Sequence, residues 1–77
     1  MMKAWLDTTI RSLVDYPEAV CISVLDGGRT SILEVRCHPE DVGKVIGRNG
    51  KTISALRTIL STRAARDKRQ IVLEVVE

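Results

Sequence analysis

The chain has 77 residues and a mass of 8.6 kDa, which allows one small domain and excludes two-domain enzymes, barrels and repeat arrays. Hydrophobic residues make up 44% and charged residues 29%, a globular composition, and no uncharged stretch is long enough to cross a membrane. The net charge is +2, and one Trp, one Tyr and no Phe are too few rings for the base-stacking sheet of an RRM or cold-shock domain.

The first predicted element is a helix over residues 2–14, because apolar residues recur there at three- and four-residue intervals. Its apolar stripe consists of Met2, Leu6, Ile10, Leu13 and Val14. Trp5 borders the stripe, and Pro17 ends the helix, since the residue before a proline is pushed out of the helical region. Charged residues interrupt this segment, so we expect no signal peptide and, with no membrane span either, a cytoplasmic protein.

Two strands joined by a tight turn follow the first helix. Alternating residues, many of them β-branched, predict a strand over residues 19–25, and residues 30–37 form the return strand. The turn between them, Asp26-Gly27-Gly28-Arg29, contains the glycines that a tight hairpin requires. In the return strand Leu33 and Val35 face one side and charged residues face the other, which indicates a sheet that is covered on one face.

Two helices and a final strand complete the predicted order. A short helix begins at Pro39-Glu40-Asp41, where the acids complement the helix dipole, and ends at Gly47. A longer helix runs from about Gly50 to Arg66, and a strand covers residues 71–76. Inward-facing side chains are predicted at Val42, Val45, Ile46, Ile53, Leu56, Leu60, Ala64, Ile71, Leu73 and Val75. The order α-β-β-α-α-β predicts an α/β (α+β) fold in which three helices cover one face of a three-stranded sheet.

The residue types that carry catalysis or bind metals are scarce in this chain. Cys21 and Cys37 are sixteen residues apart, unlike any paired-ligand motif, and His38 is the only histidine. In a cytoplasmic chain we expect both cysteines to be reduced and to act as small hydrophobic residues inside strands. His38 stands at a helix start without a nucleophile beside it, so we expect a capping or surface role. The sequence therefore predicts a protein that is not an enzyme and has no metal, cofactor or small-molecule substrate.

Basic residues are concentrated in the second half of the chain. Residues 1–35 carry three basic and five acidic side chains, whereas residues 42–69 carry eight basic side chains and one acidic one. A focused basic segment in a nearly neutral chain favours a polyanionic partner such as a nucleic acid. A solvated, arginine-rich helix face is the alternative that charge alone leaves open.

The stretch that is most informative about function joins the two predicted helices and reads Val45-Ile46-Gly47-Arg48-Asn49-Gly50-Lys51-Thr52-Ile53. Gly47 can adopt the left-handed conformation that closes the first helix, and Gly50 lets the backbone turn into the second. Free amides at the start of the second helix favour an anion, and Arg48 and Lys51 add positive charge. Asn49 adds hydrogen-bonding groups. The loop is therefore suited to gripping a phosphate backbone, and a purely structural turn between two helices is the alternative.

This stretch resembles the GXXG loop and the I-G-x-x-G-x-x-I signature of the KH domain, in the type II topology found in bacteria. The runs Asp41-Val42-Gly43-Lys44-Val45-Ile46-Gly47 and Ser54-Ala55-Leu56-Arg57-Thr58, together with the small size, resemble the KhpA (YlqC) family of bacterial single-KH-domain RNA-binding proteins. The resemblance covers nearly the whole chain. It implies a single type II KH domain over residues 1–77, with the GXXG loop at residues 47–50.

The resemblance also implies a function, namely single-stranded RNA binding with RNA chaperone activity as the expected role. In KH domains the GXXG loop clamps the backbone of about four nucleotides. We expect the bases in an apolar groove beside the loop, with part of the strand at residues 30–37 in its wall. The expected RNA-binding residues are Lys44, Val45, Ile46, Gly47, Arg48, Asn49, Gly50, Lys51, Ile53 and Arg57. The family's links to cell elongation and division imply a role in cell shape, and the sequence does not distinguish RNA from single-stranded DNA.

The outward face of the long helix carries a second feature. Helical spacing groups small, uncharged side chains there, whereas a solvated face would carry Glu, Lys or Gln. We interpret this face as an interface with a partner helix, formed by Ser54, Ala55, Thr58, Ile59, Ser61, Thr62 and Ala65. The resemblance implies a homodimer, or a heterodimer with a larger KH-containing protein (KhpB, EloR or Jag). A protein-interaction module is thus the alternative function, and a merely small, weakly polar surface is the alternative to an interface.

Overall fold

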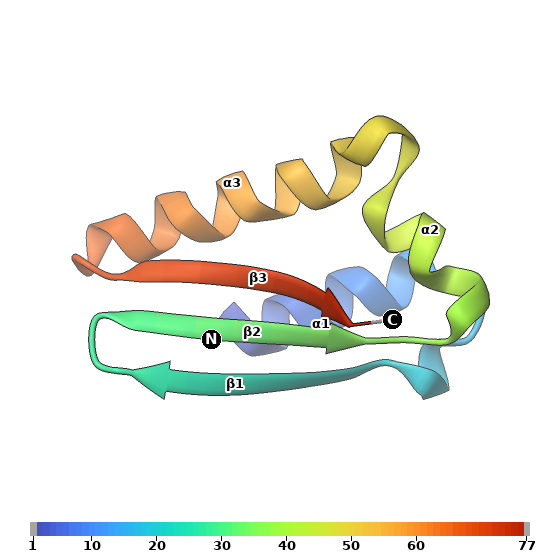
Figure 1. Cartoon of the computed structure of the whole chain (residues 1–77), viewed down its shortest axis with the longest axis horizontal. Helices are drawn as coiled ribbons and strands as arrows, with labels where there is room; N and C mark the ends of the chain where they lie inside the picture. The colour runs from blue at the N-terminus through green and yellow to red at the C-terminus, as the bar shows by residue number, and fades with distance from the viewer. Residues whose placement is uncertain (1, 77) are drawn as a thin grey trace.

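The structure, a computed structural model, describes residues 2–76. Its helices and strands follow the predicted order α-β-β-α-α-β, so this prediction is confirmed (Figure 1). The elements are α1 (Met2–Leu13), β1 (Cys21–Gly27), β2 (Thr30–Arg36), α2 (Val42–Ile46), α3 (Lys51–Arg66) and β3 (Gln70–Val76). Single 3₁₀ turns lie at Pro17–Ala19, Pro39–Asp41 and Arg48–Gly50.

The three strands form one sheet in the order β1-β2-β3. β1 and β2 are antiparallel, as their two-residue turn requires, and Leu25 pairs with Ile32. β3 runs parallel to β2, because α2 and α3 carry the chain back across the sheet before it begins. β2 is therefore the central strand, and β3 is an edge strand that lies beside α3.

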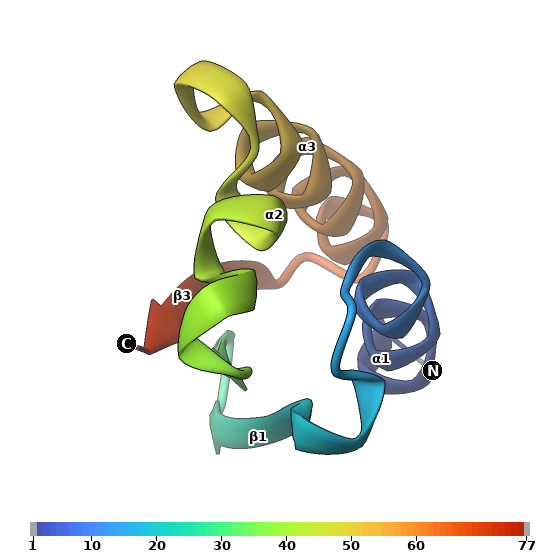
Figure 2. The same cartoon turned by 90° about the vertical axis from the view of Figure 1, so that its right-hand side faces the viewer.

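Seen along the strands, the helices lie on one side of the sheet and leave its other face uncovered (Figure 2). The core fills the space between these layers and combines α1, the sheet, α2 and α3. Its buried hydrophobic residues are Leu6, Ile10, Val20, Ile22, Leu33, Val35, Val45, Ile53, Leu56, Leu60, Ala64 and Leu73. The predicted fold class, three helices over one face of a three-stranded sheet, is confirmed.

A few side chains depart from the predicted burial. Leu13, the last residue of α1, is 40% exposed. Val42, in the first turn of the short helix α2, is only half-buried. Cys21 is exposed because it alternates with the buried Ile22 and so faces the uncovered side of the sheet. Cys37 is half-buried just after β2, and both cysteines are free thiols, as predicted.

Candidate nucleic-acid interface

The loop between α2 and α3 is built from residues in the left-handed region. Gly47, Asn49 and Gly50 have φ values of 80°, 57° and 72°. The amide of Gly47 donates to the carbonyl of Gly43 at 2.8 Å and closes α2, and the amide of Gly50 donates to the carbonyl of Gly47 at 3.1 Å. These two hydrogen bonds turn the chain twice within four residues, so that α3 starts in a new direction.

Gly47 is required by two independent constraints. Its ψ of 169° at positive φ lies in a region that only glycine adopts readily. A Cβ atom at this position would also lie 2.6 Å from Thr52 Cβ and 2.8 Å from the Thr52 amide nitrogen. At Gly50 a Cβ would meet nothing within 4 Å, so there the backbone conformation alone favours glycine.

The N-terminus of α3 is open to an anion. Gly50 occupies the N-cap position and provides no side-chain hydrogen bond, so this 16-residue helix begins without a capping side chain. The amide of Lys51 donates to the carbonyl of Arg48, so the amides that follow it are the ones that face an anion. Arg48 and Lys51 flank these amides, both are exposed, and among residues 2–76 neither takes part in an ion pair. Amides, helix dipole and two free cations therefore converge at one point of the surface.

Lys44 differs from these two cations. Its ammonium group is ion-paired with the carboxylate of Asp15 and lies 3.5 Å from Asp41 Oδ1. The hydrogen bond to Asp15 raises the pKa of Lys44, so this residue stays charged, but its charge is balanced within the fold. Lys44 was expected to contact RNA, whereas in the structure it connects α2 to the segment between α1 and β1.

The partner of Lys44, Asp41, is completely buried. Its carboxylate accepts hydrogen bonds from the amides of Asp15 at 3.2 Å and Tyr16 at 3.0 Å. Burial by itself raises the pKa of Asp41, but these amides and Lys44 outweigh it, so that the pKa lies below its ordinary value. The sequence predicted a helix-terminal charge at Asp41. The side chain makes no cap hydrogen bond to α2 and instead ties the α1–β1 segment to the base of the loop.

Asp41 should therefore make the stability of the protein depend on acidity. Because its pKa is lowered in the folded state, the carboxylate stabilises the fold above the pKa of the unfolded chain, about 3.9, and this contribution is lost as the pH falls below that value. We expect Asp41→Asn to unfold at lower urea concentration than the wild type at pH 7, with the difference shrinking below about pH 3.9. A constant difference from pH 7 to pH 2 would contradict this role.

The residues that were expected to form a base-binding groove divide into two groups. Val45 and Ile53 are 0% and 6% exposed and belong to the core, so the prediction that they form groove walls is corrected. They are buried because α2 and α3 cross over the sheet at these positions. Among the apolar residues expected in the groove walls, only Ile46 is partly accessible. Arg57 lies at the surface, where its Nε and Nη2 donate to the carbonyl of Leu73 at 3.3 and 3.0 Å.

The strand beside this surface is β3 and not β2. The sequence placed part of residues 30–37 in the groove, but β2 is the central strand, and both of its edges are paired. Between α3 and the free edge of β3 lies a hollow of about 350 Å³, lined by Ser61, Ala65, Arg69, Gln70, Ile71 and Val72. Arg57 lies on the same side of α3, between the loop and this hollow, so a strand held at the loop has a route along the edge of β3.

Residues 2–76 contain no group of three or more His, Cys, Asp or Glu side chains that could hold a metal ion. His38 accepts a hydrogen bond from the amide of Glu40 at 3.1 Å, which confirms the predicted capping role. Its ring stacks on Tyr16 with a centroid distance of 4.1 Å. None of the described helices is both long and apolar enough to cross a membrane.

Residues 3–75 match the model of the KhpA/KhpB KH-domain family. The chain belongs to this family. The family that the sequence predicted is thereby confirmed, and this family is one of KH domains and not of enzymes. No solved structure matches the chain.

Curated KhpA proteins are similar to this chain over nearly their full length. The RNA-binding protein KhpA of Clostridium acetobutylicum is 40% identical over 75 residues, which cover 97% of this chain and 100% of that protein. The RNA-binding protein KhpA of Chlamydia trachomatis is 41% identical over 76 residues, covering 99% and 97%. The KhpA of Halalkalibacterium halodurans is 37% identical over 76 residues, covering 99% and 100%.

Proposed function

We propose that this KhpA/KhpB-family chain binds single-stranded RNA through the loop at residues 47–51. The observation that carries the proposal is the start of α3, which has no side-chain cap and where Arg48 and Lys51, which form no ion pair among residues 2–76, meet beside a glycine turn. Phosphate groups are the anions that such a site holds best. The relatives named RNA-binding proteins support the choice of RNA as the polyanion.

The geometry favours a strand that runs from the loop toward the edge of β3. The exposed acids Asp15, Glu18 and Glu40 lie on the other side of α2 and repel phosphate. Among the described residues, the hollow between α3 and β3 is lined by no acid, and the cation Arg57 lies beside it. Bases there meet aliphatic and small polar side chains, since Trp5 and Tyr16 lie elsewhere. Binding of this kind is modest in affinity and loose in sequence preference, which suits an RNA chaperone acting in the cytoplasm.

Titration of a labelled single-stranded oligoribonucleotide, followed by fluorescence anisotropy, tests this function. We expect saturable binding. The logarithm of the association constant should fall linearly with the logarithm of the salt concentration, with a slope of about −0.7 for each phosphate neutralised. The same sequence annealed into a duplex should bind more weakly, because its bases are not accessible. Equal affinity for both forms, or no dependence on salt, would contradict the proposal.

A specific observation favours a second function, association through α3. The small side chains that were expected to form an interface are all exposed, and none of them is charged. Ile59 beside them is 51% exposed and lines an apolar hollow of about 260 Å³ together with Met2, Trp5, Leu60 and Arg63. A helix of a second copy fits this surface, because small side chains let two backbones approach closely. A larger KH-containing protein is the alternative partner, and the shared KhpA/KhpB model supports it.

Ser61→Arg tests this association, since a long charged side chain on the small-residue face keeps a second helix away. In analytical ultracentrifugation we expect the wild type to shift from monomer to dimer as its concentration rises, and the variant to stay monomeric. Ser12→Arg, on the exposed end of α1, is the matched control and should behave like the wild type. A wild-type protein that stays monomeric at every concentration would contradict the proposed homodimer.

A further inference from the structure

Four of the eight Lys and Arg side chains that form no ion pair among residues 2–76 lie at the end of the molecule opposite the loop. α3 separates the two ends, since its 16 residues span about 24 Å (Figure 1). At the far end, the turn between β1 and β2 lies next to the turn between α3 and β3. The two turns are joined by a hydrogen bond from the amide of Gln70 to the carbonyl of Arg29, at 2.7 Å. We call the basic side chains of this end the distal basic cluster: Lys3, Arg29, Arg63, Arg66, Lys68 and Arg69.

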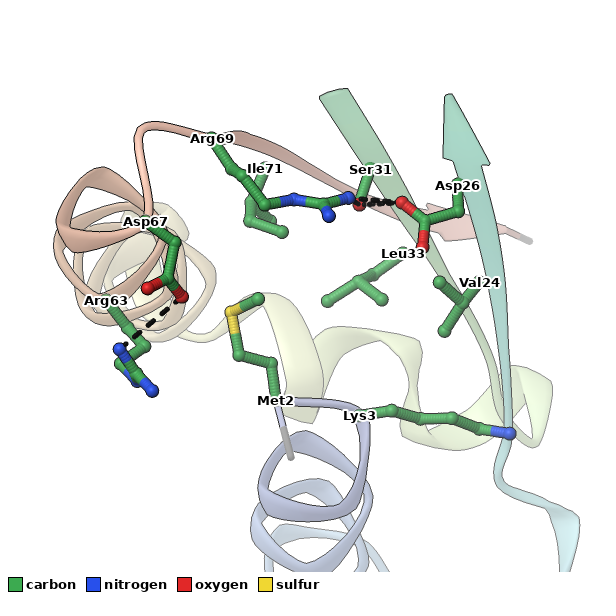
Figure 3. Close-up of a pocket in the computed structure, with 10 residues that line it drawn as sticks. All are labelled: Met2, Lys3, Val24, Asp26, Ser31, Leu33, Arg63, Asp67, Arg69 and Ile71. Carbon is green, nitrogen blue, oxygen red and sulfur yellow. Dashed lines mark hydrogen bonds and ion pairs between the residues drawn. The ribbon is translucent and has the colours of Figure 1, made fainter. Parts of the chain in front are cut away.

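A hollow of about 330 Å³ opens within the distal basic cluster (Figure 3). Its apolar lining comes from Met2, Val24, Leu33 and Ile71. Its polar lining comes from Lys3, Asp26, Ser31, Arg63, Asp67 and Arg69. Figure 3 shows Arg69 reaching across the hollow to Ser31 and Asp26, with which it is hydrogen-bonded. The Nε of Arg69 is buried and has no hydrogen-bond acceptor among the described residues.

The requirements of the fold do not explain this amount of charge. Two acids, Asp26 and Asp67, balance two of the six cations, the first through Arg69 and the second through Arg63 at 3.6 Å. The C-terminus of α3 is equivalent to about half a negative charge and needs one cation at most. The Arg63–Asp67 pair is exposed and contributes little to stability, so Arg63 is free to exchange partners. More than two positive charges are therefore left for a ligand.

We propose that this end is a second contact for the same RNA strand, in which the hollow takes one base and the distal basic cluster holds the neighbouring phosphates. The inference rests on the function proposed for the loop. A nucleotide fits the hollow because an apolar lining and cations lie side by side in a volume within the range of ligand sites.

The two contacts are connected along the surface. Arg69 lines both this hollow and the hollow between α3 and β3, and Arg57 lies between the latter and the loop. At 3.4 Å per stacked nucleotide, about seven nucleotides cover the length of α3. Once the loop is occupied, the second contact becomes intramolecular, so a strand of more than about ten nucleotides gains affinity without any new partner.

The first test compares Arg63→Gln with Arg36→Gln, which removes the same charge from the uncovered face of the sheet. Anisotropy titrations use a tetranucleotide and a single strand of about 16 nucleotides. We expect Arg63→Gln to lose about fivefold in affinity for the long strand, to flatten its salt slope by about 0.7 and to bind the tetranucleotide like the wild type. Equal affinities of the two variants for the long strand would overturn the proposal.

The second test fills the hollow without changing charge. Val24 is 40% exposed at its rim, and Val24→Phe places a ring where the base is expected. Thermal unfolding confirms that the variant folds, and its affinity for the long strand should fall about fivefold at an unchanged salt slope. An unchanged affinity for the long strand would overturn the base site. The proposal would also be overturned if a free mononucleotide bound in the hollow but the long strand bound no more tightly than the tetranucleotide. If the tetranucleotide does not bind the wild type, the function proposed for the loop is wrong.

Discussion

Replacing Gly47 with alanine is expected to lower the free energy of unfolding by about 3 kcal/mol and to abolish RNA binding. The backbone of Gly47 lies in a region that side chains rarely adopt, and an added Cβ would overlap Thr52 at the start of α3. The chain can relieve this overlap only by moving the loop away from α3. That movement separates the amides of α3 from Arg48, which the proposed phosphate site needs together.

Two other glycines provide matched controls for this variant. Gly50→Ala keeps a positive φ but meets no atom within 4 Å, so we expect a smaller loss of about 1 kcal/mol. Gly43→Ala lies in α2 with an open surface above it and should stabilise the protein by about 0.5 kcal/mol. Urea unfolding followed by circular dichroism measures all three. A Gly47→Ala variant as stable as Gly50→Ala would show that the contact with Thr52 is not limiting.

Reversing the charge of the loop should have the second large effect, on binding and not on folding. We expect Arg48→Asp combined with Asn49→Asp to weaken RNA binding about a hundredfold, or about 2.7 kcal/mol, because two carboxylates then face the phosphates. Both side chains are exposed, and Asp tolerates the left-handed conformation of Asn49, so unfolding should change by less than about 0.5 kcal/mol.

The control for this double variant is Arg36→Asp, a charge reversal on the uncovered face of the sheet. It should reduce RNA affinity only through the change in net charge, and therefore by much less. Anisotropy at two salt concentrations separates the effects, since the loop variant also loses salt dependence. If both variants bind RNA equally well, the loop does not hold the phosphates. Survival of dimerisation in the loop variant would show that association does not depend on the loop.

Features with a local cause were predictable from the sequence. Periodicity defined α1, α3 and the strands, and the glycines of the 47–50 loop indicated its left-handed turns. Features that depend on distant partners were not. The carboxylate of Asp41 bonds to amides 25 and 26 positions away, and Lys44 pairs with Asp15 across 29 positions. No local pattern reveals such contacts, so Lys44 was grouped with the cations that are free.

The position of the basic residues shows the same limit. The sequence revealed one basic segment at residues 42–69, but α3 divides it between two ends of the molecule. Lys3 and Arg29 join the far end from other parts of the chain, because α1 and the hairpin turn pack there. The strand that lies beside the proposed groove is likewise set by the order of the strands in the sheet, which periodicity does not reveal. The sequence therefore predicted β2 at this place, whereas the structure has β3.

The central claim is that amides and cations at the start of α3 hold the phosphates of RNA. Titration of the ¹⁵N-labelled protein with a single-stranded tetranucleotide, followed by two-dimensional NMR, tests it most directly. The account predicts that the amide resonances of residues 47–52 shift most, while those of the uncovered face, such as Glu34 and Arg36, stay in place. Shifts confined to other surfaces, with the loop resonances unmoved by saturating RNA, would contradict it.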